Sequence, residues 1–524
     1  MNKAYRLIWS KAKERWVIAA EIIKGNGGPS PITVAAAVVT SLIMAASGAL
    51  ALPTGGQVAA GQAAISSPSA TQMNIKQGTN QAIINWNSFG IGKGEAVNIA
   101  QPTNQSTLLN RVLGNDPSNI FGSLTANGRV FLTNPSGIFF APGSSVNVGG
   151  LVASSLSIKD SDFLAGKYSF FKDGTAGSVV NQGNISGGFV ALLGNSVENA
   201  GTIVTTKGTT GLAAGDDITL GFDPNGLMAI KVDKGAYQAQ VNNSGVIEAD
   251  GGTVVMTASA ADALLSTVVN NSGKVRARSM VVRNGEIVIE GGNVTNSGTL
   301  DVSGQGEGSV KGGTITLSGD HITLAGGSLL DASGTSGGGT VLVGGDWQGS
   351  GDMHQATTVT MEQGAKIDAS ATQSGNGGKV VLWSDINKAD SHTSVAGSIT
   401  AEGSGSGQGG KVETSGHTLK IGETASVKTG GGTWLLDPYD FTIASSGGDI
   451  TGAALQTALG SGNVSITTNA GNVAVTGATA GSGTSTGSGN IIINDAFGWS
   501  ANTLTLTADR YILVNNVVSV SWRR

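Results

Sequence analysis

The sequence predicts an all-β fold, a right-handed parallel β-helix in which short strands wind into stacked coils. Glycine supplies 83 of the 524 residues, and short runs of Val, Ile, Leu and Thr lie between the glycines. Only 12% of the residues are charged while 39% are hydrophobic, which favours many short strands over a disordered chain. Two motifs also recur with gaps of roughly 16 to 40 residues, as expected of a solenoid. The glycines have no three-residue period, which excludes collagen.

The two recurring motifs predict where the coils turn. The first is Asn-x-Gly-x-aliphatic, which occurs at 181–185, 199–203, 243–247, 271–275 and 296–300. The second is Gly-Gly-x followed by an aliphatic or aromatic residue, at 187–190, 251–254, 291–294, 312–315, 338–341, 377–380, 409–412, 431–434 and 447–450. Gly permits a sharp corner, and equivalent Asn side chains can stack into ladders. We expect the last residue of each motif, such as Val341, to point inward. A β-sandwich or propeller is the alternative, but the irregular spacing fits neither well.

Residues 1–51 have the organisation of a signal peptide, which we expect to be helical and to be removed from the mature protein. Six basic and two acidic residues are followed by an apolar run at 32–46. Small residues come next, and the sequence ending at Ala51 fits cleavage before Leu52. An inner-membrane anchor is the alternative, although the apolar run is short for a membrane span.

The remainder of the chain has neither a long apolar run nor a basic block. No apolar run in it reaches 18 residues, so we expect no membrane-spanning helix in the mature protein. Without a cluster of Lys and Arg, nucleic-acid binding has no electrostatic footprint. The mature protein is expected to begin with residues 52–65, followed by strands at 82–91 and 96–100. A solenoid needs a cap over its first coil, because an open end exposes unpaired strand edges.

The block at 108–156 alternates tight turns with short apolar strands. Turns are expected at 126–128 and 134–137, because Asn and Gly tolerate positive φ and Pro fixes φ. The block resembles the secretion domain of two-partner secretion exoproteins, of the filamentous haemagglutinin and high-molecular-weight adhesin type. In that family an Asn-Arg-Val element is followed by a turn reading Asn-Pro-Asn-Gly-Ile. The matching residues here are Asn110, Arg111 and Val112, and then Asn134, Pro135, Ser136, Gly137 and Ile138.

One position of the turn departs from the family pattern. Ser136 stands where Asn is usual, but Ser also favours turns. A second Asn-Pro motif, found in part of the family, has no match here, although residues 115–120 occupy roughly that region. Residues 1–25 resemble the extended signal peptide of large Gram-negative exoproteins, and the sequence from 311 onward resembles the repeats of these adhesins. The resemblances imply a signal peptide at 1–51, a secretion domain at 52–310 and Gly-rich β-helix repeats at 311–524.

The resemblance implies an adhesin-like exoprotein, secreted or held at the surface of a Gram-negative cell. After export by the Sec pathway, the periplasmic domains of a dedicated outer-membrane transporter would read the two motifs, and the unfolded chain would cross its β-barrel. The absence of Cys fits such threading, although a large stacked core also needs no disulfide. We expect no cofactor and no enzyme activity, and the sequence does not name a host receptor.

Two other functions remain open. A polysaccharide-acting β-helix enzyme would gather carboxylates in one cleft, and Asp216, Asp217 and Asp223 lie close together in the sequence. The chain could instead be the inactive N-terminal part of a haemolysin or growth-inhibition toxin. An autotransporter passenger fits poorly, because no alternating barrel strands follow. Four histidines have no metal-binding spacing, namely His321, His354, His392 and His417.

Six asparagines begin an Asn-x-Ser/Thr sequence, the pattern at which some adhesins of this family are glycosylated. They are Asn104, Asn184, Asn242, Asn270, Asn293 and Asn463. Such triplets also arise by chance in a chain rich in Asn, Ser and Thr.

The last expected strands, at 503–521, end without a closing element. A finished solenoid needs a polar cap, so we expect the chain to be the truncated N-terminal part of a longer exoprotein. At roughly 20–25 residues per coil, the mature chain would form on the order of 20 coils. Neighbouring coils would be stacked about 4.8 Å apart, as neighbouring strands are.

Overall fold

The computed structural model describes residues 5–10, 15–20 and 52–521, except for 224–226, 238, 261–267, 282–283, 306–307 and 470–487. The chain divides into two units, Met1–Ser47 and Gly48–Arg524. In the first, strands β1 (Tyr5–Ser10) and β2 (Arg15–Ala20) pair as an antiparallel hairpin. The helix expected for the signal segment is therefore wrong in its described part, where aromatic and β-branched residues favour strands. The apolar run at 32–46 and Ala51 lie outside the described residues.

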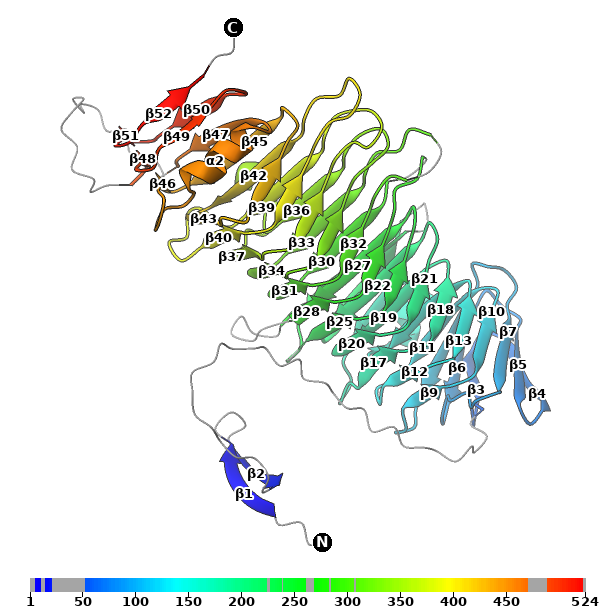
Figure 1. The fold of residues 1–524 in the computed structure, drawn as a ribbon. Coiled ribbons are helices and arrows are strands. Elements are labelled where there is room, and N and C mark those ends of the chain that lie inside the picture. The colour runs from blue at the N-terminus through cyan, green and yellow to red at the C-terminus, as the bar shows by residue number, and fades with distance from the viewer. Residues whose placement is uncertain are drawn as a thin grey trace. The chain divides into compact units, whose positions relative to one another are not determined.

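The second unit is a parallel β-helix of three sheets, which confirms the predicted fold (Figure 1). Each complete coil contributes a strand to sheet 3, then to sheet 2, then to sheet 1. Sheet 1 contains β3 (Gln57–Ala60), β6 (Gln81–Trp86), β8 (Thr107–Val112), β11 (Arg129–Thr133), β14 (Gly150–Ser154), β19 (Val190–Gly194), β22 (Thr209–Ala214), β27 (Thr253–Ala258), β30 (Glu286–Glu290), β33 (Thr314–Ser318), β36 (Thr340–Val343), β39 (Lys379–Trp383), β42 (Lys411–Gly416), β45 (Thr433–Pro438), β47 (Asn463–Thr467) and β50 (Leu504–Thr507).

The other two sheets are shorter. Sheet 2 contains β4 (Ala63–Ser69), β5 (Gln72–Gln77), β7 (Ala96–Ala100), β10 (Ser123–Ala126), β13 (Ser145–Val148), β18 (Asn184–Gly187), β21 (Thr202–Val204), β26 (Val246–Glu248), β29 (Lys274–Arg276), β32 (Thr299–Asp301), β35 (Leu329–Asp331), β38 (Lys366–Asp368), β41 (Ser398–Thr400) and β44 (Ser426–Lys428). Sheet 3 contains β9 (Ser118–Ile120), β12 (Ile138–Phe140), β17 (Ser178–Asn181), β20 (Ser196–Asn199), β25 (Gln240–Asn243), β28 (Val268–Asn271), β31 (Asn293–Asn296), β34 (His321–Leu324), β37 (Thr358–Met361), β40 (His392–Val395) and β43 (Thr418–Ile421).

The core is a continuous apolar column inside the coils. Alternate residues of each strand point inward, as the period of a β-strand requires. Val341 is fully buried and stacks between Ile315 and Val380 of the adjacent coils, as predicted. Within the described residues, sheet 1 has sixteen strands, fewer than the roughly 20 coils expected, because long loops and a four-stranded sheet outside the coils lengthen many turns.

The Asn motif marks the corner between sheets 3 and 2. Its first residues form a hydrogen-bonded column, here called the Asn column, in which each side-chain Nδ2 donates to Oδ1 one coil further along the chain. The four distances are 2.7, 2.7, 2.8 and 2.7 Å, and the members are Asn181, Asn199, Asn243, Asn271 and Asn296. All five side chains are buried. The predicted ladder is confirmed, and it ends where Leu324 occupies the next position.

The Gly-Gly motif marks the corner between sheets 2 and 1. Seven of its nine copies precede a strand of sheet 1, whereas 291–294 runs into β31 of sheet 3 and 447–450 leads into no strand. A Cβ on Gly378 would lie 2.1 Å from the carbonyl oxygen of Gly339, and a Cβ on Gly339 would lie 2.2 Å from that of Gly313. Close approach of backbones from stacked coils therefore requires glycine here.

Both ends of the described solenoid depart from the regular coil. At the start, β3 pairs antiparallel with β6, and β4 pairs antiparallel with β5, which closes the first coil as the expected cap. Near the end, helix α2 (Gly452–Leu459) buries Leu455 and Leu459. The same region contains two small parallel sheets, one of β46 (Phe441–Ile443), β48 (Ile491–Ile493) and β51 (Ile512–Val514), the other of β49 (Phe497–Trp499) and β52 (Val518–Val520).

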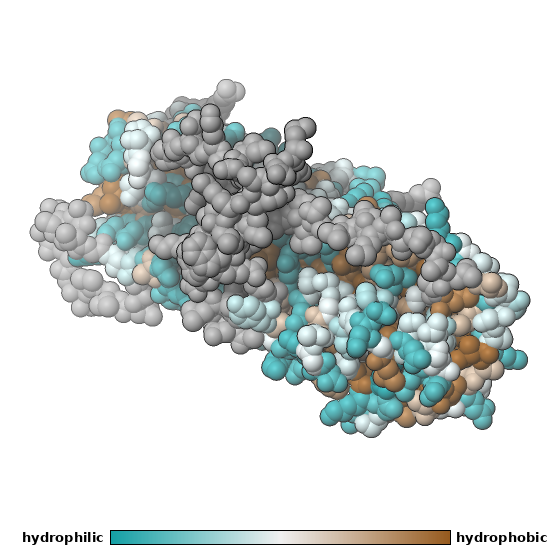
Figure 2. All heavy atoms as spheres, turned by 90° about the horizontal axis from the view of Figure 1, so that it is seen from below, coloured by the Kyte–Doolittle hydropathy of each residue, from teal (hydrophilic) through white to brown (hydrophobic). Residues whose placement is uncertain are grey.

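A four-stranded antiparallel sheet covers the outside of sheet 1 over its N-terminal strands, and the sequence did not predict it. It contains β15 (Ser157–Ile158), β16 (Tyr168–Phe171), β23 (Asp217–Phe222) and β24 (Met228–Lys234), with helix α1 (Asp160–Leu164) between its first two strands. Its apolar side chains, such as Phe170 and Leu220, form a second core with outward residues of sheet 1, such as Phe131 and Leu109. On the face in Figure 2, hydrophilic and apolar residues are interspersed over the described surface.

Candidate functional site

The Asn-Arg-Val motif lies on β8 and contacts three elements. Asn110 points inward and is fully buried. Its Oδ1 accepts a hydrogen bond from Trp86 Nε1 at 3.0 Å, and its Nδ2 donates to the Phe131 carbonyl at 3.4 Å. The amide therefore joins β6, β8 and β11 inside the core, where an unpaired polar group is costly. Val112 is buried on the same side.

Arg111 points outward and joins sheet 1 to the four-stranded sheet. Its Nη2 donates to the Ile158 carbonyl at 2.8 Å and lies 2.5 Å from a carboxylate oxygen of Asp160. Ile158 ends β15, and Asp160 lies in the first turn of α1. Arg111 therefore fixes the point at which the chain leaves the coil.

The Asn-Pro-Ser-Gly-Ile motif forms the tight turn that the sequence predicts. Asn134 is fully buried; its Oδ1 accepts from the Ser136 backbone N–H at 2.9 Å, and its Nδ2 donates to Ser118 Oγ at 3.0 Å. Gly137 adopts a φ of 107°, which favours glycine, and its N–H donates to the Asn134 carbonyl at 2.9 Å. Ser136 enters this network through its backbone N–H, which explains why Ser can replace Asn there.

The structure brings the two motifs together. Arg111 is the direct neighbour of Thr133, and Asn134 follows Thr133, so both motifs lie at the corner between sheets 1 and 3 in adjacent coils. Five of the eight motif residues are buried; Arg111, Pro135 and Ser136 are half-buried. Their side chains are thus mostly hidden in the folded protein.

Three apolar side chains that sequence reasoning missed flank the motifs at the surface. Leu113 is 62% exposed and Phe121 43% exposed. Phe121 also meets half-buried Phe139 edge-on, with ring centroids 6.2 Å apart. The sequence could have predicted their exposure, because each directly follows a residue expected to point inward: Val112, Ile120 or Ile138. The neighbours of inward residues on a strand face outward.

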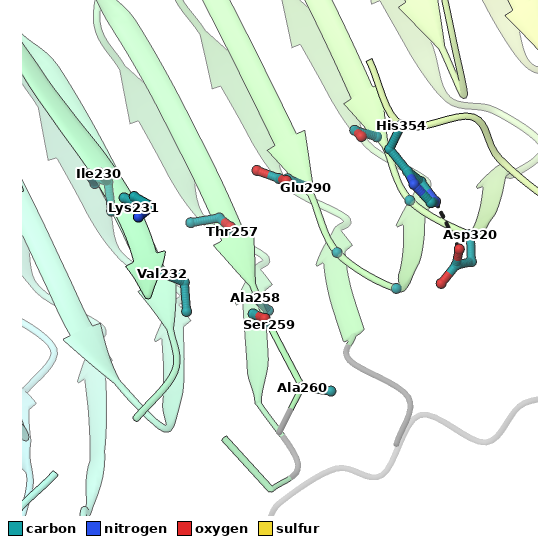
Figure 3. Close-up of a pocket in the computed structure, with 14 residues that line it drawn as sticks. Ile230, Lys231, Val232, Thr257, Ala258, Ser259, Ala260, Glu290, Asp320 and His354 are labelled. Atoms are coloured by element: carbon teal, nitrogen blue, oxygen red, sulfur yellow. Dashed lines mark hydrogen bonds and ion pairs between the residues drawn. The ribbon is translucent and has the colours of Figure 1, made fainter. Parts of the chain in front are cut away.

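A surface groove of about 620 Å³ lies further along the outside of sheet 1, beside the free edge of the four-stranded sheet (Figure 3). Ile230 and Lys231 of β24 line one side, and Thr257 and Glu290 come from the ends of β27 and β30. His354 lies at the other side and contacts Asp320, with Nε2 2.8 Å from Oδ1.

The acidic residues considered for polysaccharide cleavage do not line this groove. Asp216 lies 3.4 Å from the Lys172 ammonium and 4.0 Å from that of Lys234. Asp217 lies on β23, and Asp223 accepts a hydrogen bond from the Leu227 N–H at 2.7 Å. Their contacts are those of a turn and a strand end.

The four histidines, spread over the sequence, all lie near the corner between sheets 1 and 3. His321 and His392 begin β34 and β40 and flank Thr358 of β37, whereas His354 and His417 precede β37 and β43. Within the described ranges, no group of three or more His, Asp or Glu residues is arranged to hold a metal ion.

The sequence-predicted glycosylation positions differ in exposure. Asn104 and Asn184 are exposed, whereas the other four are half-buried: Asn242, Asn270, Asn293 and Asn463. Asn270 Nδ2 also donates to Asn242 Oδ1 at 3.1 Å. Of the predicted cleavage pair, Leu52 is described and half-buried, whereas Ala51 lies outside the described residues.

Family models match the first part of the chain. The model of the TPS secretion domain matches residues 49–302, and that of the Extended Signal Peptide of Type V secretion system matches residues 1–50. In the described part of the chain, no helix is both long and apolar enough to cross a membrane.

The chain is similar to several proteins of Haemophilus influenzae. Two curated relatives, each named heme/hemopexin-binding protein, are 32% and 31% identical over 266 and 269 residues, which is 49% and 47% of this chain. The matches span only 29% of either relative's length. The crystal structure of the HMW1 secretion domain is 31% identical, with a TM-score of 0.64, and the match covers 74% of this chain and 100% of that domain.

Proposed function

Because the chain belongs to the two-partner secretion exoproteins, we propose that its N-terminal β-helix delivers it to a dedicated outer-membrane transporter and that the exported chain acts as an adhesin. The extended signal peptide and the secretion domain direct it through the Sec pathway and then to the medium or cell surface of a Gram-negative bacterium. The partner would be a transporter with periplasmic domains and a β-barrel.

The burial of the two motifs supports recognition before the coils close. Asn110 and Asn134 are both fully buried, and their amides are occupied by hydrogen bonds inside the molecule. A partner can therefore read these amides directly only while the chain is unfolded. Recognition would use the residues proposed from the sequence, Asn110 to Val112 and Asn134 to Ile138. Closing of the coils would then hide them and help release the chain.

Coil closure also supplies a driving force for export. Each coil removes several aliphatic side chains from water, and burial of one such side chain is worth roughly 1.5–3 kcal/mol. Stacking outside the cell would therefore favour outward movement without ATP.

Export of Asn134→Ala tests this proposal. With the cognate transporter, we expect its secreted fraction to fall about tenfold or more, whereas Asn119→Ala, an exposed change in the neighbouring coil, is secreted normally. Asn134 also holds a turn, so a folding defect must be separated from a recognition defect. The affinities of the wild type and of Asn134→Ala for the transporter's periplasmic domains should therefore be compared in mild denaturant, where both exoprotein chains are unfolded. Wild-type affinity there, with normal secretion of both Asn134→Ala and Asn110→Ala, would contradict recognition through these residues.

The adhesin assignment rests on the family and on the likeness to the HMW1 secretion domain. The curated relatives are named for binding heme and hemopexin, and this chain spans 29% of their length. A binding assay of the secreted protein on host cells, with competition by heme and hemopexin in parallel, separates the two activities.

The Asp216 contacts described above give no support to the polysaccharide-acting alternative, and loss of glycan cleavage in Asp216→Ala would be needed to revive it.

A change in the stacked side chains supports an inner boundary between the two proposed parts near residue 310. The Asn column ends at Asn296, and a run of stacked Asp301, Asp331 and Asp368 begins on sheet 2 directly afterwards. We propose that 52–310 is the secretion domain and that 311–524 extends the solenoid.

Cleavage between Ala51 and Leu52 can be checked by N-terminal sequencing, and glycosylation of the six asparagines by mass spectrometry of the secreted protein.

A further inference from the structure

The loop between β36 and β37 covers part of the outside of sheet 1. This cover loop, residues 344–357, contains the short helix η1 (Trp347–Gly349). It lies on Trp383, whose Nε1 donates to Gln355 Oε1 at 3.0 Å. Trp383 and its apolar neighbours Val381 and Ile386 are buried, and Trp347 packs against them.

A fully buried carboxyl group holds the cover loop to the sheet. Glu413 points outward from β42, between Val381 of β39 and Leu435 of β45, and has no exposed surface. Its Oε2 accepts from the Gln348 backbone N–H at 2.8 Å, and its Oε1 accepts from Ser415 Oγ at 3.0 Å. The contact with Gln348 joins η1, which follows β36, to β42, the second strand further along sheet 1.

A second buried acid lies beside the first. Asp437 of β45 is 3% exposed, and its backbone N–H donates to Ser415 Oγ at 3.3 Å. Its Oδ1 is buried and has no hydrogen-bond partner. The Ser415 hydroxyl therefore links the two acids, because it donates to the Glu413 carboxyl group and accepts from the Asp437 backbone.

The surrounding charges do not neutralise this pair. Glu413 faces Asp437 from β45 and Asp346 from the cover loop, and Asp437 also faces Asp509. The nearest cation on β39, Lys379, lies 2.7 Å from a carboxylate oxygen of Asp346. Among the described residues, no Lys, Arg or His forms an ion pair with Glu413 or Asp437.

We propose that Glu413 and Asp437 form a proton-gated latch, which closes the cover loop when protons are bound and releases it from Trp383 and Val381 when both acids are ionised. Opening the loop lets water reach Glu413, so the open state stabilises the carboxylate while the closed state stabilises the acid. Burial, together with the charges of Asp437 and Asp346, raises the pKa of Glu413 to about 7. Burial and the charge of Asp509 raise the pKa of Asp437 to about 6. Protons therefore favour closure across mildly acidic to neutral pH.

Hydrogen exchange at the Gln348 amide tests the latch in the secreted protein. After correction for the intrinsic rate, we expect its opening constant to rise about tenfold or more between about pH 5.5 and 8.5, since one unit of pKa shift corresponds to a factor of ten. The emission of Trp347 and Trp383 should shift over the same range. Glu413→Gln, which keeps the acceptor without the charge, should show little pH dependence.

The matched control is Glu423→Gln, an exposed acid outside the cluster, which should behave as the wild type. A pH-independent opening constant in the wild type overturns the proposal, and this holds even if Glu413→Gln fails to fold. A folded Glu413→Gln that keeps the full wild-type pH dependence overturns it as well.

Discussion

At the scale of single residues, the buried Asn side chains combine two roles. The Asn column satisfies polar groups that would otherwise be unpaired inside the corner, and Asn110 and Asn134 do the same within their coils. Each amide both donates and accepts, so loss of one member leaves a donor unpaired in one coil and an acceptor unpaired in the other.

Asn243→Ala should therefore destabilise the coils on both sides of β25. We expect a loss of about 2–4 kcal/mol, from two buried groups left without partners. Hydrogen exchange of the amides in β20, β25 and β28 measures this locally. The adjacent Asn242→Ala removes a half-buried side chain that, among the described residues, bonds Asn270 alone, and it should change the same opening free energies by about 0.5 kcal/mol or less. Equal effects of the two substitutions would contradict the role given to the column.

The pKa of Glu413 also predicts how overall stability depends on pH. The folded state raises this pKa to about 7 from 4.5, so in that window the folded protein binds more protons than the unfolded chain. The stabilisation is complete below about pH 4.5 and is lost as pH rises through about 7. The melting temperatures of wild type and Glu413→Gln should be compared at each pH. Their difference reports the contribution of Glu413, because the other acids contribute equally to both proteins. A constant difference from pH 4 to 8 would contradict it.

At the scale of elements, Arg111 joins the four-stranded sheet to sheet 1 at the point where the chain leaves the coil. Arg111 contacts the end of β15 and the start of α1, and the apolar contacts of Phe163 and Phe170 lie beyond that point. The carboxylate of Asp160 is 49% exposed, so water and salt weaken the pair and its contribution is modest.

Arg111→Ala should loosen this sheet without unfolding the coils. We expect about 1–2 kcal/mol less stability, mostly from the lost hydrogen bond to the Ile158 carbonyl. Limited proteolysis should then cut residues 157–172 faster, while the spectrum of the β-helix is retained. Lys167→Ala removes an exposed charge in the same segment and serves as the control. Unchanged cleavage in Arg111→Ala would show that the apolar contacts alone hold the sheet.

The repeats allowed the solenoid to be predicted, but not the elements outside it. The Gly-Gly motif and the inward aliphatic residue after it recur along the sequence because neighbouring coils impose the same contacts. The structure confirms the turns expected at the motif and the inward position of Val341. Strands β16 and β23 alternate like any other strand, so nothing in their sequence shows that they leave the coil. The motif residues were found by resemblance. Their burial was not predicted, because Asn is usually exposed and only the coil places Trp86 beside Asn110.

At the scale of the whole β-helix unit, neighbouring coils share one core, so damage should spread along it. Val341→Asp would place a carboxylate between Ile315 and Val380 without a partner. We expect a loss of about 4 kcal/mol or more, with increased exchange over several coils on each side. Circular dichroism and hydrogen exchange measure both effects. Thr340→Asp, on the outward face of the same strand, should be tolerated, and an equal loss there would contradict inward packing as the cause.

The antiparallel cap at β3 and β4 gives the solenoid a direction. The first coil is blocked on its outer side, so new coils can be added only beyond it, and each Asn column amide donates toward the coil that follows. If the N-terminal end leaves a pore first, each completed coil opposes backward movement of the chain, because sliding back requires that the last coil unfold. The chain would then be pulled out by its own winding, one turn at a time.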